Sequence, residues 1–482
     1  MSGAPAALAA LGLAGVWFLS RPGSAGRGGV LSGWSGRDRG GAARWARGRD
    51  VRALTIPGPV PGRLTLGTAG RRLLAVEPGH SLIVIGPTRS GKTTGLAVPA
   101  LLEWEGPVLA ASVKSDLARD SLAWRRRQGQ VWVYDPSGST GLPAARWSPL
   151  DGAGTWAGAR RVAAGLVETA RTSGGGLSDS DFWYATAAKL LGPLLLAAAR
   201  SGRSMADVAG WVDDQEADEV ADILAGAGEF GALRAARAAW GRDERQRSAV
   251  YTTAETILEV FADPAVAASA RPGPGADRID PAALLRNHGT LYLCAPAHDQ
   301  RRLRPLFAGL VTQVLEAAYD EVARTGRPLD PPLLVLLDEA ANVAPVAELD
   351  VLASTAAGHG IQLVTVWQDL AQLTARYGPR SGTVVNNHRA KLFLSGIADP
   401  ATLDHASQLI GDGDHPMSST TVDGRGQATT TTQLSPRRLL PPDALRRLPP
   451  NTGVLITGHH QPTRLTLRPW YRNREHRRRR GV

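Results

Sequence analysis

The stretch that decides the fold is "SLIVIGPTRSGKTTG", residues 81–95. It opens with an apolar run typical of a buried strand, and residues 86–93 match the phosphate-binding-loop pattern of Gly, four residues, then Gly-Lys-Thr. In such a loop the glycines let backbone N–H groups converge on phosphate oxygens, at the start of a helix whose dipole favours negative charge. The stretch therefore predicts a strand, a nucleotide-binding loop and a helix in that order.

The residues of this loop have separate expected roles. We expect Lys92 to reach the β- and γ-phosphates and the Thr93 hydroxyl to occupy a Mg²⁺ position. No guanine-reading "NKxD" stretch occurs in the chain, which favours ATP as the nucleotide. The full set of residues predicted to bind ATP with Mg²⁺ is Gly86, Pro87, Thr88, Arg89, Ser90, Gly91, Lys92, Thr93 and Thr94.

Two later apolar runs end in polar residues that complete the predicted site. In "LLVLLDEAAN" (333–342), Asp338 is expected to hold Mg²⁺ through water and Glu339 to polarise the attacking water, as in a motor ATPase rather than a small GTPase. In "IQLVTVWQ" (361–368), Gln368 is expected beside Asp338 at the carboxyl edge of the sheet, as a γ-phosphate sensor or a capping or packing amide. The predicted catalytic residues are Lys92, Asp338, Glu339 and Gln368, and the predicted Mg²⁺ positions are Thr93 and Asp338.

Three further residues are assigned from their local sequence context. Lys114 in "SVKSDL" would contact phosphate or DNA, or cap the next helix. His359 lies on a Gly-rich turn and is assigned to that turn rather than to a metal site. Cys294 is the single cysteine, which excludes a disulfide within the chain, and we expect it to pack in the core.

The rest of the chain predicts an α/β fold. Short apolar runs alternate with helical stretches, as in a parallel sheet with crossover helices. The section 156–275 has no strand-like run but has Ala and Leu at helical spacing, which predicts an all-helical insertion. The predicted strands lie at 81–86, 107–112, 130–136, 289–296, 333–340, 361–368, 390–396 and 453–458.

Three polar or charged segments stand out from this core. The stretch 412–433 is polar and predicts an exposed hairpin or loop, and the basic "RNREHRRRR" near the C-terminus is expected to be disordered. The acidic "WVDDQEADEVAD" (211–222) suits a basic protein partner better than DNA, unless its acids only form a solvated helix face.

The N-terminal run "APAALAALGLAGVWFLS" (4–20) is uncharged and just reaches the lower limit of about 17 residues for a membrane span. Arginines follow it and no basic segment precedes it, which favours a membrane anchor with the remaining chain in the cytoplasm over a secretory signal. The net charge of +11, mostly arginine, suits nucleic acid or an anionic membrane, although an arginine-rich genome would also produce it. The predicted division begins with an anchor (1–20) and a linker (21–50). A nucleotide-binding domain (51–155 and 276–460) follows, interrupted by the helical insertion (156–275), and a basic tail (461–482) ends the chain.

With these motifs in order, residues 75–460 resemble the coupling-protein ATPases of type IV secretion and conjugation. The motifs that carry the resemblance are "GPTRSGKTT", "SVKSDL", "YDPSG", "DFWYATAAKLLGPLLLAAA", "LLDEAANVAPVAELD", "GHGIQLVTVWQDLAQL" and "NNHRAKLFLSG". The resemblance implies a RecA-like motor domain in a homo-hexamer anchored in the cytoplasmic membrane. It further implies ATP-driven passage of single-stranded DNA, with its bound relaxase, into a type IV secretion channel.

The chain departs from the family pattern in two places. The family typically has two transmembrane helices, whereas this chain offers one short span, and it often has a basic residue before "GHG" where this chain has Ala356 and Ala357. An arginine acting on a neighbour's nucleotide would then come from elsewhere, with Arg376 and Arg389 as candidates. Two alternatives stay open: a receptor that recruits substrates without hydrolysing ATP, and a DNA-segregation translocase, which would require a C-terminal winged helix larger than the residues after 460 can form.

Overall fold

The computed structural model describes residues 42–481, apart from positions 113, 171–177, 272–274, 276, 297, 341–345, 423–425 and 427. Ala42–Val482 form one compact unit. The predicted membrane anchor (1–20) and most of the predicted linker (21–50) lie outside the described residues.

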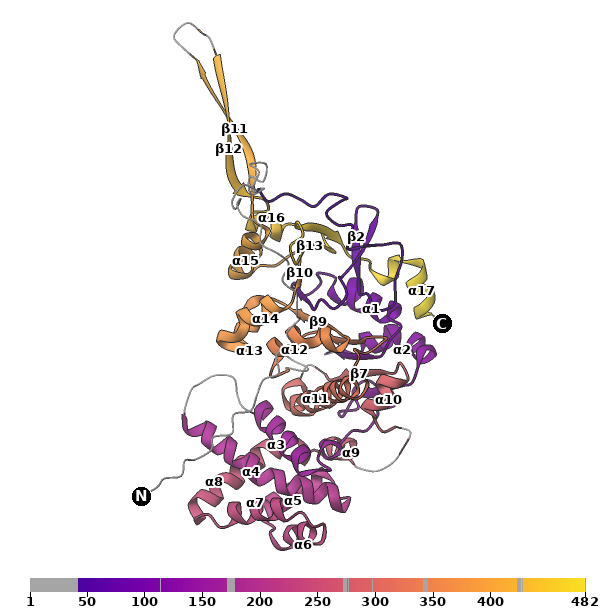
Figure 1. Ribbon diagram of the computed structural model, residues 1–482, viewed down its shortest axis with the longest axis vertical. Helices are drawn as coiled ribbons and strands as arrows, with labels where there is room; N and C mark the ends of the chain where they lie inside the picture. Colours follow the sequence, from indigo (N-terminus) through magenta and orange to yellow (C-terminus); the bar gives the residue numbers. More distant parts are fainter. Residues whose placement is uncertain are drawn as a thin grey trace, which may run out of the picture. The chain divides into compact units, whose positions relative to one another are not determined.

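A mixed twelve-stranded sheet forms the centre of this unit (Figure 1). Seven of its strands run parallel, in the spatial order β10, β4, β9, β8, β5, β7, β6. Each coincides with an apolar run that predicts a strand, so the parallel-rich α/β class is confirmed. These strands are β4 (Leu82–Ile85), β5 (Val108–Ser112), β6 (Val131–Tyr134), β7 (Thr290–Cys294), β8 (Leu333–Leu337), β9 (Ile361–Trp367) and β10 (Ala390–Leu394).

An antiparallel wing extends the sheet beyond β10, and the sequence patterns do not predict it. The run 453–458 does form a strand, β13, but it pairs antiparallel with β10, so its expected parallel direction is wrong. The next strand, β14, alternates buried and exposed side chains, which is typical of an antiparallel strand with one solvated face. The wing consists of β13 (Thr452–Thr457), β14 (Thr463–Thr466), β2 (Thr65–Ala69), β3 (Arg72–Ala75) and β1 (Thr55–Ile56).

Helices cover both faces of the parallel part, which explains why its strands are apolar throughout. Along β4, Leu82 and Val84 pack into the cluster that contains α1 (Val98–Glu103) and α2 (Asp116–Gln128). Ile83 and Ile85 pack into the opposite cluster, which contains α11 (Gln300–Thr325). The shorter helices are α10 (Pro281–Arg286), α12 (Leu349–Thr355), α13 (Leu370–Tyr377), α14 (Ser381–Asn387), α15 (Pro400–Ile410) and α16 (Pro442–Arg446).

Helices also occupy the chain between β6 and β7 (Figure 1). At their centre, α4 packs against α3, α5, α6, α7 and α8. Among the described helices, α4 alone is long and apolar enough to span a membrane, over Asp181–Ser201. However, 61% of the apolar stretch in this segment is buried within the unit, as in the core helix of a soluble protein. The helices that precede α10 in this connection are α3 (Trp156–Ala170), α4 (Ser178–Ser201), α5 (Met205–Asp213), α6 (Asp218–Gly226), α7 (Phe230–Trp240), α8 (Glu244–Leu258) and α9 (Pro264–Ser269).

The two outer segments near the C-terminus have different outcomes. The polar stretch 412–433, predicted as an exposed hairpin or loop, forms the hairpin: β11 (Asp412–Val422) pairs with β12 (Ala428–Arg438). The predicted disorder of the basic tail is wrong, because α17 (Arg474–Arg480) packs on α1 and α2. The His476 side chain is buried there, with its Nε2 atom 2.6 Å from Glu103 Oε1, and the Arg479 guanidinium lies 4.8 Å from the Trp124 ring centroid. The basic tail is therefore ordered because Glu103 and Trp124 contact its charged side chains, although its composition alone predicts disorder.

Candidate nucleotide-binding site

The phosphate-binding loop leaves the carboxyl end of β4 in the predicted context. The Gly86 N–H donates to the Trp367 carbonyl on β9 (3.0 Å), which fixes the start of the loop against the neighbouring strand. Arg89 and Gly91 adopt left-handed backbone conformations (φ 65° and 96°), and these two residues curve the loop. A π-helical turn, Thr93–Ala97, then leads into α1. Strand, loop and helix thus follow one another as the sequence predicts.

Two glycines of the loop are required by close neighbours. A Cβ atom at Gly91 would lie 2.4 Å from Asn451 Oδ1, and one at Gly86 would lie 2.8 Å from Ser90 Oγ. Both of these neighbours are ends of side chains that can turn away, but a Cβ atom at Gly86 would also lie 2.9 Å from Leu394 Cβ, and the positive φ of Gly91 (96°) strains any residue with a side chain. Asn451 lies in the connection between α16 and β13, and no motif in the sequence associates it with the loop.

The Lys92 ammonium is held by the loop itself. Its Nζ donates to the carbonyl oxygens of Gly86 and Pro87, the second at 2.8 Å. Burial lowers the pKa of Lys92, and the nearby carboxylates of Asp338 and Glu339 partly oppose that effect. Because its hydrogen-bond partners are neutral carbonyls, the ammonium is available to an incoming phosphate, which would be a stronger acceptor.

Thr93 and Asp338 meet although 245 positions separate them. The Thr93 hydroxyl donates to Asp338 Oδ2 at 3.1 Å. Burial raises the pKa of Asp338 to about 6, with the Asp116 and Glu339 charges adding to the effect and the Thr93 hydrogen bond opposing it. A buried carboxylate beside a hydroxyl supplies the oxygen ligands that Mg²⁺ prefers, and a cation would relieve the cost of ionising Asp338. In the same loop Ser90 Oγ is buried and has no hydrogen-bond partner among the described residues, so the residues fit a Mg²⁺–nucleotide.

Glu339 and Gln368 lie at the same edge of the sheet with different local geometry. Glu339 is half-buried and has a left-handed backbone (φ 62°), a conformation that is uncommon for such a side chain and is enriched at functional sites. β9 lies between β4 and β8, so Gln368 follows the strand that separates the loop from Asp338. The Gln368 N–H donates to Gln372 Oε1 at 3.0 Å. The catalytic and sensor roles of Glu339 and Gln368 stay predictions.

Two further acids, Asp116 and Asp135, lie at this edge, and the sequence motifs assign them no role in the site. Asp116, the first residue of α2, is close enough to raise the pKa of Asp338 and contributes to the raised pKa of Cys294. Asp135 follows β6; burial would raise its pKa, but hydrogen bonds from Thr140 and Ser137 outweigh burial and lower it. The sequence does show Asp135 directly after an apolar run, in "YDPSG", and Asp116 four positions after the end of another, in "SVKSDL".

Lys114, His359 and Cys294 lie in different parts of the unit. Lys114 has an exposed side chain and its N–H donates to Ser112 Oγ (3.3 Å), so neither of its predicted roles is decided. His359 belongs to a 3₁₀ turn, where its Nδ1 lies 3.0 Å from the Thr355 carbonyl, in agreement with the turn assignment. Cys294 is buried in the core as expected.

The two candidate arginines lie at different places relative to the loop. Arg376 is in the last turn of α13, near enough to Arg304 to lower the pKa of that residue, although burial is the larger cause. Arg389 precedes β10, and Ala390 pairs with Leu82 at the start of β4, so Arg389 lies at the sheet edge opposite the loop. Action on the nucleotide of a neighbouring subunit stays a prediction for both.

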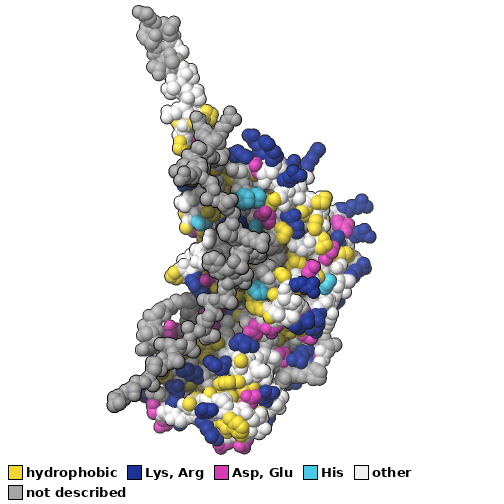
Figure 2. Space-filling model, in the orientation of Figure 1, with side chains coloured by type: hydrophobic (Ala, Val, Ile, Leu, Met, Phe, Trp, Pro, Cys, Tyr) yellow, Lys and Arg dark blue, Asp and Glu magenta, His cyan; other side chains and the backbone are white. Residues whose placement is uncertain are grey.

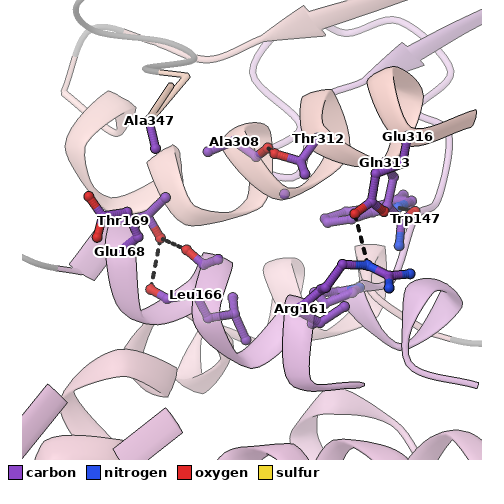
Figure 3. A pocket seen from close by; sticks show the side chains of 14 residues that line it. Trp147, Arg161, Leu166, Glu168, Thr169, Ala308, Thr312, Gln313, Glu316 and Ala347 are labelled. Carbon is purple, nitrogen blue, oxygen red and sulfur yellow. Dashed lines mark hydrogen bonds and ion pairs between the residues drawn. The ribbon is translucent and has the colours of Figure 1, made fainter. Parts of the chain in front are cut away.

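A separate cavity of about 90 Å³ lies between α3 and α11 (Figure 3). The Trp147 indole N–H donates to Gln313 Oε1 at 2.7 Å in its wall, and Arg161 pairs with Glu316 at 3.1 Å. Its lining includes no residue of the phosphate-binding loop, so the cavity is distinct from the candidate site.

Known proteins resemble this chain along most of its length. Conjugal transfer protein TraG of Escherichia coli is 27% identical over 467 residues, which cover 85% of this chain and 71% of TraG. Protein VirD4 of Agrobacterium fabrum is 26% identical over 468 residues, which cover 90% of this chain and 66% of VirD4. The unbound bacterial conjugative coupling protein TrwB superimposes with a TM-score of 0.66 at 17% identity, covering 88% of this chain and 92% of that chain.

A second TrwB structure, in complex with ADP and Mg²⁺, has a TM-score of 0.63 at 17% identity and covers 89% of this chain and 94% of that one. At 17% identity, these structural similarities show a shared fold. The sequence evidence is broader. A family model for type IV secretory system conjugative DNA transfer matches residues 55–481. The resemblance carried by the motifs is thereby confirmed, and this chain belongs to the family of type IV secretory system conjugative DNA transfer proteins.

Proposed function

We propose that this chain is an ATP-driven coupling protein that passes single-stranded DNA, with its bound relaxase, into a type IV secretion channel. It acts as a homo-hexamer, anchored in the cytoplasmic membrane by residues 4–20, with the motor in the cytoplasm. The observation that carries the proposal is the hydrogen bond between Thr93 and Asp338, because it joins the two motifs that a motor ATPase needs. Support also comes from TrwB, whose fold this chain shares and which has been solved with a non-hydrolysable ATP analogue and with ADP and Mg²⁺.

Each residue of the site has a defined part in the proposed reaction. Lys92 binds the β- and γ-phosphates once its ammonium leaves the carbonyls of Gly86 and Pro87. Thr93 and Asp338 hold the Mg²⁺, which supplies charge neutralisation at the phosphates. Glu339 orients the attacking water and accepts its proton, and Gln368 contacts the γ-phosphate region from the end of β9.

The test is ATP turnover by the purified full-length protein and three variants. Lys92→Ala and Glu339→Gln should each lower turnover by a factor of about 10² or more, because each removes a group that stabilises the transition state. Glu339→Gln should still bind ATP, whereas Lys92→Ala should bind it weakly. Lys189→Ala, an exposed lysine on α4, is the matched control and should turn over ATP normally. Normal turnover by both site variants would refute the catalytic assignment.

A receptor that binds ATP without hydrolysing it is the second candidate. The observation in its favour is that Ala356, which is fully buried, and Ala357 stand where the family often has a basic residue. The same assay separates the two functions. Saturable ATP binding by the parent protein with no turnover, in the presence or absence of single-stranded DNA, would establish the receptor.

A further inference from the structure

The β11–β12 hairpin is a two-stranded sheet with no third strand among the described residues. Its eleven residue pairs run from Asp412–Arg438 at the base to Val422–Ala428 near the tip. The side chains from Asp414 to Thr420 and from Thr430 to Leu434 are exposed, and at the base the Asp412 carbonyl accepts a hydrogen bond from the Ala43 N–H at 2.8 Å. In Figure 1 it projects away from α15 and α16. An isolated two-stranded hairpin is only marginally stable in water, so a partner strand would stabilise this one.

Between the base, where Pro416 and Pro436 lie, and the tip, the edges of the hairpin lack the features that normally prevent strands from pairing. Proteins protect exposed edges with charged side chains, especially lysine. Here residues 416–422 and 428–436 carry no ionisable side chain, and Figure 2 shows the described part of the projecting hairpin without basic or acidic colour above its base. The strands are instead rich in Thr and Ser, and cross-strand hydroxyls lie 3.3 Å apart in the pairs Ser418–Thr432 and Thr420–Thr430. Nucleic acid is a poor partner for residues 416–422 and 428–436, because these stretches carry no cation to meet its phosphates.

The charges at the base differ between the two strands. Asp412 and Asp414 lie on β11, whereas Arg437 and Arg438 lie on β12. Asp412 pairs with Arg438 within the hairpin at 3.3 Å, but Asp414 and Arg437 are exposed and form no ion pair with any described residue. The β11 edge of one hairpin is therefore complementary in charge to the β12 edge of another, while two β11 edges would bring acids together.

We propose that the hairpin pairs with the hairpin of a second copy of this chain, β11 against β12, so that successive copies form a continuous antiparallel sheet. Because the two paired edges are different, the contact is head-to-tail, and such contacts generate rings when the rotation closes. Backbone hydrogen bonds along the strands give the contact its strength, and the base charges set its polarity. The inference rests on the proposed ring assembly and adds a surface that would hold the ring together independently of the nucleotide.

The chain is well suited to a cross-linking test. Its single cysteine, Cys294, is buried, and burial raises the pKa of its thiol to about 12, so it should not react with maleimides at neutral pH. Thr420→Cys places one thiol on β11 and Thr430→Cys places one on β12. When two full-length variants with one introduced cysteine each are co-expressed, every cross-link between introduced thiols joins different chains. Like strands of successive copies would lie two strands apart, at about 9.6 Å, so the cross-linker is a short bismaleimide whose reach stays below that spacing and that joins thiols on adjacent strands only.

The expected result is a cross-linked dimer when Thr420→Cys and Thr430→Cys are co-expressed, and none with either variant alone. Thr256→Cys, exposed on α8, replaces the Thr430 variant as the matched control and should give no dimer. Adding Thr432→Lys and Leu434→Lys to the Thr430→Cys chain should abolish the dimer, because lysines on the β12 edge oppose strand pairing.

Several outcomes would overturn the proposal. A dimer from each variant alone would mean a symmetric contact, and no dimer from the mixed variants would mean that the hairpins do not meet. A cross-link to another protein in native membranes, in place of the dimer, would assign the hairpin to that protein. The Lys92→Ala background separates this inference from the proposed function: a dimer that persists without ATP turnover supports the hairpin contact, whatever the turnover of the parent protein.

Discussion

Asp338→Asn should stabilise the protein without nucleotide, although it removes a residue of the proposed catalytic site. Burial raises the pKa of Asp338 from 3.8 to about 6 in the folded protein. Above pH 6 the folded state must therefore ionise a carboxyl that the unfolded chain ionises readily, at a cost of about 3 kcal/mol. Asparagine has nearly the same shape and can still accept the Thr93 hydrogen bond, but it carries no charge.

The pH dependence follows from the sign of the pKa shift. Below pH 3.8 the carboxyl is protonated in both states, so the variant and the parent should be about equally stable. Between the two pKa values only the folded parent keeps its proton, and its stability falls as the pH rises. Above pH 6 the advantage of the variant should be constant at about 3 kcal/mol, or a melting temperature about 3 °C higher for a unit of this size.

The measurement is thermal unfolding of the full-length variant and parent, without nucleotide, from pH 4 to pH 8. Asp135→Asn is the matched control, because hydrogen bonds from Thr140 and Ser137 lower the pKa of that buried carboxyl despite its burial. The control should be destabilised, most strongly above pH 4. An Asp338→Asn variant that is less stable than the parent at pH 8, or whose advantage does not change with pH, would refute the reasoning.

Three further predictions concern the surface and the C-terminal helix. The affinity for single-stranded DNA should fall linearly with salt on logarithmic axes and depend little on base sequence, because arginines supply the contacts; a salt-insensitive titration would contradict this. Charge reversal at the exposed residues Asp213, Asp214 and Asp222 should leave ATP turnover unchanged but reduce both conjugative transfer and pull-down of basic partners. Glu216 is left unchanged in this variant because its carboxylate accepts a hydrogen bond from the Glu219 N–H at the start of α6. Unchanged transfer and binding would show that these acids only form a solvated surface. His476→Ala should destabilise the protein by about 1–3 kcal/mol in thermal or urea unfolding, because it removes a buried partner of a carboxylate, and an unchanged midpoint would contradict that.

Local patterns determined the parts of this protein that depend on neighbouring residues alone. The apolar runs predict the parallel strands because a strand covered on both faces must be apolar throughout. The spacing of glycines, Lys92 and Thr93 predicts the loop because the conformation of a phosphate-binding loop is encoded in consecutive residues. The acids after "LLVLL" predict the other half of the site, since residues that follow parallel strands share one edge of a sheet.

Only the tertiary structure decided which distant segments meet. The contact of Thr93 with Asp338 requires β9 to insert between β4 and β8, and strand order depends on packing over the whole sheet. Asn451 approaches Gly91 because β13 reverses direction beside β10, which the composition of the run does not reveal. The basic tail is ordered because the His476 side chain contacts Glu103, which is 373 positions away in the sequence. The composition of a segment shows that it is charged. Whether the segment is ordered depends on whether the fold places groups of opposite charge against it.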